Sequence, residues 1–152
     1  LGTLTGNSKN HSLSDLANGN NILENKRVLL VEDNIINQKV TSKILQKWNL
    51  KIDIASNGKI AVEKIQNKDY DIVLMDLQMP VMDGIEATKT IRALGGKYAT
   101  LPIIALTASA VLEIKQNAIS AGLDDFISKP FKPDYLFKKL INFVSDKNTQ
   151  AL

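Results

Sequence analysis

The stretch VLMDLQMPVMDG, residues 73–84, is an apolar run that ends in an aspartate and continues into a loop punctuated by proline and glycine. With the residues before it, YDIVLMD at 70–76 predicts a strand buried on both faces, because its apolar residues are continuous instead of alternating. A helix is predicted to follow from about Gly84 to Leu94. The stretch therefore predicts a buried strand that delivers the carboxylate of Asp76 to the lip of a loop.

Predicted strands and predicted helices alternate along the rest of the chain. Apolar, β-branched runs predict strands, and apolar residues three and four apart predict helices. The first helix carries Ile36, Val40, Ile44, Leu45 and Trp48 on one broad face, the pattern of a helix that packs by that face. Such alternation indicates right-handed βαβ crossovers and a parallel sheet covered on both sides. The predicted strands are residues 27–33, 51–56, 70–76, 101–108 and 124–131, and the predicted helices are residues 34–48, 58–68, 84–94, 109–122 and 132–145.

Residues at the ends of the predicted helices support these boundaries. Asn49 stands where a left-handed residue is expected to end the first helix. Asn57 precedes the second helix and is predicted to cap it with its side-chain oxygen. Gly122 is predicted to close the fourth helix, so that turn chemistry and apolar period agree.

Composition divides the chain into one domain and two short ends. Residues 1–25 are rich in asparagine, serine, glycine and threonine, which predicts a flexible linker or tail, since such a segment buries too little surface to offset its ordering entropy. Residues 26–146 are predicted to form one domain, and a hydrophobic content of 44% is enough to fill its core. Residues 147–152 are expected to be a C-terminal tail.

The composition also excludes several classes of protein. There is no cysteine, so disulfides, thiolate catalysis and Cys-ligated zinc are excluded, and the single histidine, His11, has no partner at metal-ligand spacing. The net charge of +3 is mild and its lysines do not form a nucleic-acid footprint, so no nucleic acid is expected as a partner. No apolar run is long enough for a membrane span and no signal peptide is visible. We expect a cytoplasmic monomer or weak dimer whose own surface makes no membrane contact, even if a parent chain is membrane-anchored.

Polar groups follow the predicted strands at one end of the sheet. In an open parallel sheet the functional crevice lies beyond the carboxyl ends of the strands. There the crowded acids would repel one another, and a hard divalent cation such as Mg²⁺ would relieve the repulsion. A single acid or threonine at a strand end is usually only a helix cap or a turn residue. The prediction of a site therefore depends on several such groups occurring together at the same end of the sheet. The groups at these ends are Glu32-Asp33, Asp76, Thr107-Ala108 and Lys129-Pro130.

The set suits phosphoryl transfer. A carboxylate can act as a nucleophile that forms an aspartyl phosphate. The transfer then needs positioning and neutralisation of the phosphoryl oxygens, which Mg²⁺, the ammonium of Lys129, the hydroxyl of Thr107 and a backbone N–H can supply. Asp124 and Asp125 lie at the start of a predicted strand instead, and we expect them to be solvated turn acids.

At these residues the chain resembles the receiver domain of two-component response regulators, over about residues 26–146. The segments LLVEDNIINQKV, DIVLMDLQMPVMDGIEAT, IIALTASA and AGLDDFISKPF occur in the order of that family, and their wording is most similar to receivers of hybrid sensor histidine kinases. The resemblance implies a flavodoxin-like, doubly wound α/β fold with five parallel strands in the order 2-1-3-4-5 and five helices. That order is carried over from the chemotaxis member of this family and does not follow from the apolar pattern.

The resemblance also implies a role for each site residue. Asp76 matches the phosphoacceptor, and Lys129 and Thr107 match the residues that assist it. The bond between Lys129 and Pro130 is expected to be cis. Thr107 and Phe126 match the switch pair, with phenylalanine where tyrosine is often found. Mg²⁺, for which Mn²⁺ can substitute, would be held by Glu32, Asp33, Asp76 and the backbone carbonyl of Gln78, and the phosphoryl group would contact the backbone at Leu77 and Ala108.

The function implied is Mg²⁺-dependent transfer of a phosphoryl group from a phosphohistidine, on a histidine kinase or a histidine phosphotransfer domain, to Asp76. Such a domain catalyses only its own phosphorylation and dephosphorylation, while a hybrid parent chain would be a histidine kinase. The linker-like residues 1–25 and the short end after the last helix favour a C-terminal receiver of a hybrid kinase, with a stand-alone regulator as the alternative. An Asp-nucleophile phosphatase is disfavoured, because such an enzyme needs a second acid shortly after the nucleophile and Leu-Gln-Met follows Asp76. A pseudo-receiver that acts without phosphorylation is disfavoured because the set of site residues is complete.

Overall fold

The apolar runs form five parallel strands, and the sheet order is β2-β1-β3-β4-β5, which confirms the order 2-1-3-4-5. The computed structural model describes residues 22–79, 81–108 and 112–151. The strands are β1 (Arg27–Val31), β2 (Lys51–Ala55), β3 (Ile72–Asp76), β4 (Ile103–Thr107) and β5 (Asp125–Ser128). The helices are α3 (Ile35–Gln46), α4 (Gly58–Asn67), α5 (Gly84–Ala93), α6 (Leu112–Ala121) and α7 (Pro133–Ala151), with a 3₁₀ helix η1 (Gly96–Ala99) before β4.

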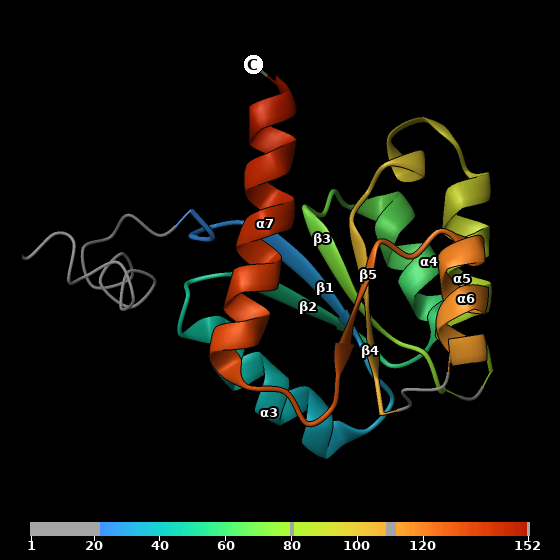
Figure 1. Cartoon of the computed structure of the whole chain (residues 1–152), viewed down its shortest axis with the longest axis horizontal. Helices are drawn as coiled ribbons and strands as arrows, with labels where there is room; N and C mark the ends of the chain where they lie inside the picture. Colours follow the sequence, from blue (N-terminus) through green and yellow to red (C-terminus); the bar gives the residue numbers. More distant parts are fainter. Residues whose placement is uncertain (1–21, 80, 109–111, 152) are drawn as a thin grey trace, which may run out of the picture.

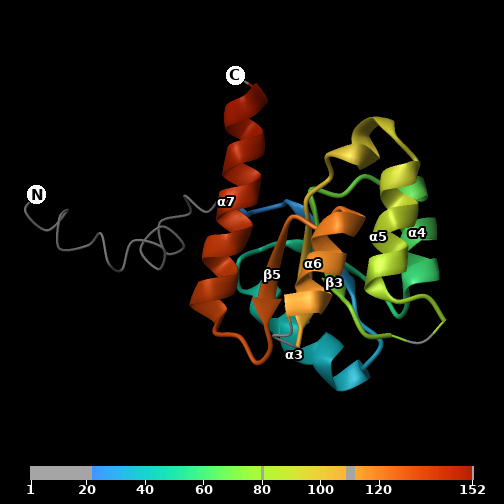
Figure 2. The same cartoon turned by 45° about the vertical axis from the view of Figure 1, so that its right-hand side comes forward.

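Helices cover both faces of the sheet. Figure 1 shows α3 and α7 on one side and α4, α5 and α6 on the other, and Figure 2 shows the same layers after rotation. The alternating side chains of the strands divide accordingly into two apolar cores. Leu30 and Leu74 pack with Leu45 and Leu140 on the α3–α7 side. Every residue of β3 is buried, as expected for a central parallel strand covered on both faces.

The residues that α3 buries are not all those of its predicted apolar face. Ile36 and Val40 are exposed, to 70% and 53%, while α3 buries Thr41 and Leu45. The physical reason is that only the C-terminal half of α3 reaches the core, where Leu45 and Trp48 pack. The N-terminal half therefore presents an apolar surface to solvent.

The ends of the elements follow local chemistry. Asn57 caps α4 by accepting a hydrogen bond from the amide of Ile60, and Asn49 has a φ of 59°, so both predictions are confirmed. Helix α7 runs on to Ala151, past the predicted end at residue 145, because the segment that follows contains no glycine or proline to stop it.

The chain before β1 also takes part in the fold. Residues 22–25, assigned to the tail by composition, form a turn whose Leu23 is fully buried in the core shared by α3 and α7. The amide of Asn25 donates to the carbonyl of Asn49, which ties this turn to the start of β2. Residues 1–21 and residue 152, which complete the two predicted tails, lie outside the described residues. Among the helices that the structure describes, none is both long and apolar enough to cross a membrane.

Candidate active site at the carboxyl ends of the strands

Two adjacent central strands bring three carboxylates together. Val31 of β1 is paired with Met75 of β3, so Glu32, which follows β1, and Asp76, which ends β3, emerge side by side. Glu32, Asp33 and Asp76 each offer an oxygen within 4.8 Å of the others. A cluster with carboxylate oxygens alone suits a hard cation such as Mg²⁺ or Mn²⁺ and not a zinc site of nitrogen and sulfur donors.

Glu32 is paired with Lys129, the cation that follows β5. The side chain of Glu32 is almost completely buried, and its Oε1 accepts a hydrogen bond of 2.8 Å from Lys129 Nζ. Its Oε2 accepts a bond of 3.2 Å from the amide of Asn34. Burial by itself raises the pKa of Glu32, but these two hydrogen bonds, with the charge of Lys129 and the neighbouring Asp76, hold the pKa below its ordinary value of 4.5. Glu32 is therefore charged in the resting site.

Asp76 has the opposite electrostatic character. It is buried at the end of β3, and Lys129 Nζ lies 3.6 Å from its Oδ2, farther than from Glu32. Burial is the largest effect and, with the neighbouring Glu32, raises the pKa of Asp76 from 3.8 to about 6 against the opposing hydrogen bond from the amide of Gln78. Of the two acids, Asp76 is therefore the one that holds a proton more tightly, and it loses that proton as the pH rises through about 6.

The remaining predicted residues lie on β4 and β5 or in the loops that follow the strands. Thr107 is buried at the end of β4, and its carbonyl accepts a hydrogen bond of 2.8 Å from the amide of Lys129. The Lys129–Pro130 bond is cis. Phe126 is half-buried on β5, with Lys115 Nζ 6.0 Å from its ring centroid. Of the two residues with predicted backbone contacts, Leu77 is buried and Ala108 is exposed.

The loop after Asp76 depends on a glycine at its far end. A Cβ added to Gly84 would lie 2.3 Å from the carbonyl oxygen of Asp76, so α5 can begin this close to the site only without a side chain there. The side chain of Asp83 caps the helix by accepting from the amide of Glu86. Within the loop, Val81 has a φ of 72°, which is strained for a β-branched residue, and Pro80 lies outside the described residues.

Asp124 is exposed just before β5, as expected of a turn acid, but Asp124 and Asp125 both have partners that the sequence did not predict. Asp124 Oδ2 accepts from the amide of Ile103 at 2.8 Å and from Arg92 at 3.1 Å, and Asp125 pairs with Lys139 at 2.6 Å. The physical reason is that β5 is an edge strand, and these contacts tie its first residues to β4, α5 and α7. Sequence reasoning also missed Arg92, for which the only signal was a basic residue in the last turn of a helix.

A groove borders the carboxylates on the side of α3. Its volume is about 350 Å³ and its lining is mostly apolar, because the exposed part of α3 faces the loop that follows β5. The lining residues are Asn37, Val40, Thr41 and Ile44 from α3 and Ala108, Lys129, Pro130 and Phe131 from the strand ends.

Comparisons with known proteins identify this arrangement. The response regulator receiver domain family matches residues 28–141. Hybrid signal transduction histidine kinase B of Dictyostelium discoideum is 40% identical over 126 residues, which are 76% of this chain and 6% of that protein. The chain therefore spans only a small part of the curated relatives it matches.

Two solved structures share the fold. The receiver domain of a sensor histidine kinase from Pseudomonas aeruginosa, with a magnesium ion in its active-site cleft, is 37% identical with a TM-score of 0.75, over 80% of this chain and 98% of that one. The receiver domain of Saccharomyces cerevisiae Ssk1, solved with the histidine phosphotransfer protein Ypd1, gives 34% identity and a TM-score of 0.74 over 86% and 94%. The family match over most of the chain, the sheet order and these structures agree, and the chain belongs to the response regulator receiver domains of two-component phosphorelay systems.

Proposed function

We propose that this chain receives a phosphoryl group on Asp76 from the phosphohistidine of a histidine kinase or a histidine phosphotransfer domain. The observation that carries the proposal is the placement of Asp76 at the end of a central strand, 3.6 Å from the ammonium of Lys129 and beside two further carboxylates. A nucleophile needs this combination of cation and oxygen ligands to approach a charged phosphoryl group.

The transfer forms one bond and breaks one. An oxygen of ionised Asp76 attacks phosphorus, the phosphorus–nitrogen bond breaks, and its electron pair returns to the imidazole nitrogen of the donor. Lys129 then neutralises one phosphoryl oxygen, which requires its ammonium to turn from Glu32 toward Asp76. The hydroxyl of Thr107 and the backbone at Leu77 and Ala108 are proposed to contact the other oxygens.

Glu32, Asp33, Asp76 and the backbone carbonyl of Gln78 are proposed to hold Mg²⁺, with Mn²⁺ able to take the same oxygen ligands. The ion, when bound, supplies positive charge to the phosphoryl oxygens during transfer. The clustering of three carboxylate oxygens within 4.8 Å supports the site, and so does the magnesium ion in the cleft of the similar Pseudomonas receiver.

The exposed half of α3 is proposed to dock the phosphohistidine partner. Ile36 and Val40 are apolar and exposed, Lys39 and Lys43 are exposed between and beside them, and the adjoining groove of about 350 Å³ leads to Lys129. An apolar patch with a basic rim fits a helix that carries an apolar stripe and acidic neighbours. The complex of the similar Ssk1 receiver with a histidine phosphotransfer protein supports a partner of this kind.

We infer further that residues 26–146 act as the receiver of a hybrid histidine kinase, with a stand-alone regulator as the alternative. The similarity to hybrid kinases supports the first of these two architectures. The full set of acids with Lys129 and Thr107 favours a phosphorylated receiver over one that acts without phosphorylation.

The test is incubation of the chain with acetyl phosphate and Mg²⁺, followed by intact-mass measurement. The wild type should gain one acid-stable, base-labile phosphoryl group, and Asp76→Asn should gain none. Asp69→Asn, which changes an exposed aspartate paired with Lys97, is the matched control and should react like the wild type. Undiminished phosphorylation of Asp76→Asn would refute the assignment.

A further inference from the structure

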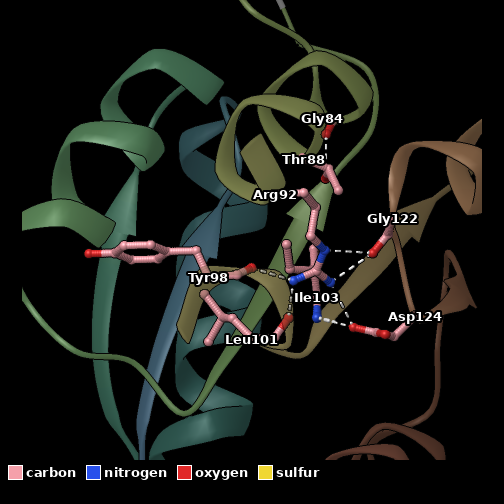
Figure 3. Close-up of polar contacts among 8 residues, drawn as sticks. All are labelled: Gly84, Thr88, Arg92, Tyr98, Leu101, Ile103, Gly122 and Asp124. Atoms are coloured by element: carbon pink, nitrogen blue, oxygen red, sulfur yellow. Dashed lines mark hydrogen bonds and ion pairs between the residues drawn. The ribbon is translucent and has the colours of Figure 1, made fainter. Parts of the chain in front are cut away.

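Arg92, at the end of α5, uses all of its donors to join three separate segments (Figure 3). Its Nε and Nη2 donate to the carbonyl of Gly122 at 3.0 and 2.7 Å. Its Nη1 donates to the carbonyls of Tyr98 and Leu101 at 2.8 and 2.7 Å. Its Nη2 also donates to Asp124 Oδ2 at 3.1 Å. A guanidinium has five N–H groups in a rigid plane, and these five bonds account for all of them.

The same network holds the turn between α6 and β5 in one conformation. Gly122 has a φ of 111°, and a Cβ at this position would lie 2.8 Å from Cγ of Arg92. The turn is therefore shaped both by a glycine-only backbone and by the close approach of the arginine stem. Asp124 extends the contact into the sheet, because its Oδ2 accepts from the amide of Ile103 and its own amide donates to the carbonyl of Ile103.

Helix α6 is held much less firmly along its length. Of its residues, all of which the structure describes, only Ala118 and Ala121 are buried, both near its C-terminal end. Leu112 in its first turn is 68% exposed. Small side chains such as alanine bury little area and interlock weakly with a neighbouring surface, so they resist rotation of a helix poorly. Ile114, partly buried against the core, holds the first half of α6 by apolar contact, whereas the polar clamp at Gly122 fixes its C-terminal end.

The two ends of α6 thus have different environments. Its N-terminal side follows Thr107 and Ala108, the strand end where a phosphoryl group on Asp76 would act, with residues 109–111 outside the described part of the chain. Its C-terminal end is bound to Arg92. We propose that Arg92 is a fixed pivot, about which α6 swings at Gly122 when the end near Thr107 responds to phosphorylation. This pivot rests on the proposed function of Asp76.

The first experiment needs no phosphoryl group. Amide hydrogen exchange of residues 118–125 is measured in wild type, in Arg92→Met, which keeps an apolar stem but no donor, and in Lys89→Met, which removes an exposed charge from the same helix. Exchange should be about tenfold faster or more in Arg92→Met and unchanged in Lys89→Met, because bonds to a charged donor are worth more than neutral ones. Arg92→Lys keeps the charge but not the planar set of donors, so it should be intermediate. Equal protection in all four proteins would overturn the clamp.

The second experiment adds beryllofluoride and Mg²⁺ as a phosphoryl mimic. In wild type the change in exchange should be confined to the first half of α6, at residues 112–117, with residues 121–125 unchanged. In Arg92→Met the change should spread to residues 121–125, while acetyl phosphate still modifies Asp76 at the wild-type rate. Equal change at both ends of α6 in wild type would overturn the pivot alone. Failure of wild type to bind the mimic or to be phosphorylated would overturn the proposed function, and with it the role of the pivot in signalling.

Discussion

Substitution of Asp76 by asparagine should stabilise the fold in the absence of a divalent cation. In the resting site Asp76 is a buried acid beside the charged carboxylate of Glu32, and burial raises its pKa from 3.8 to about 6. An ionised Asp76 is therefore a cost to the folded state, even though Lys129 lies near it. Asparagine has nearly the same shape and can still accept the hydrogen bond from the amide of Gln78, but it carries no charge.

The sign and the size both follow from the pKa. Below pH 3.8 the carboxyl of Asp76 is protonated whether the chain is folded or unfolded, so it contributes nothing. Between pH 3.8 and about 6 the unfolded chain has released the proton and the folded chain has kept it, so stability falls as the pH rises. Above about 6 the penalty is complete, and it is at most about 3 kcal/mol, since one pH unit corresponds to about 1.4 kcal/mol. Allowing for relaxation around the pair, we expect Asp76→Asn to gain about 1–3 kcal/mol at neutral pH.

The assay is urea unfolding with a chelator present, for wild type and Asp76→Asn, at several values between about pH 4 and about pH 8. The stability difference should be small near pH 4 and should grow to its full size above about pH 6. Glu32→Gln is the control of opposite sign, because the pKa of Glu32 is lowered and its removal leaves Lys129 without its 2.8 Å partner. The electrostatic reasoning is refuted if Asp76→Asn is no more stable than wild type near neutral pH, or if its advantage is the same at all pH values.

Three further outcomes are expected. In thermal melts, saturating Mg²⁺ should raise the Tm of wild type by relieving the repulsion among the crowded carboxylates, and Asp33→Ala should lose most of this rise. A wild-type Tm that does not change with Mg²⁺ would contradict the proposed metal site. Val40→Asp on the exposed half of α3 should slow transfer from a phosphohistidine partner by about tenfold or more, without changing the rate with acetyl phosphate. Equal slowing with both donors would contradict docking of the partner on α3. Thr107→Ala should still be phosphorylated on Asp76 but should lose the response of Phe126, read by chemical shifts with beryllofluoride. An unaltered Phe126 response would disprove the coupling, which gains about 1 kcal/mol if the ring becomes fully buried, because it is already half-buried.

The sheet was predictable because its signals are local. Continuous apolar runs predict central parallel strands, and the structure buries all of β3 and β4. The side-chain cap at Asn57 and the left-handed residue at Asn49 also depend on neighbouring residues alone. The strand order itself came from the family resemblance, since apolar patterns do not state which strands are neighbours.

The failures concern contacts between distant segments. The apolar period of α3 identified a face but not what covers it, and Ile36 and Val40 proved to lie beyond the core. The sequence marks Asp124 only as a turn acid because no partner lies near it in the chain, whereas Arg92 lies 32 positions earlier on another helix. An arginine that binds backbone carbonyls leaves no pattern of paired charges in a sequence. The role of Arg92 is therefore visible only in the three-dimensional structure.

The electrostatics of the resting site also explain why its acids are arranged as they are. Lys129 Nζ lies 2.8 Å from Glu32 and 3.6 Å from Asp76, so Asp76, the proposed nucleophile, is the acid with the weaker contact to the cation. A stronger pair between Lys129 and Asp76 would stabilise the resting fold, but the ammonium would then have to leave Asp76 before it could donate a hydrogen bond to a phosphoryl oxygen. With Lys129 anchored on Glu32, Asp76 keeps a raised pKa and an unfavourable charge that a cation or a phosphoryl group with its cation relieves. The crowding that should weaken the fold without a divalent cation is thus the same feature that should give the site an affinity for Mg²⁺, and a variant that removes the first should lose the second.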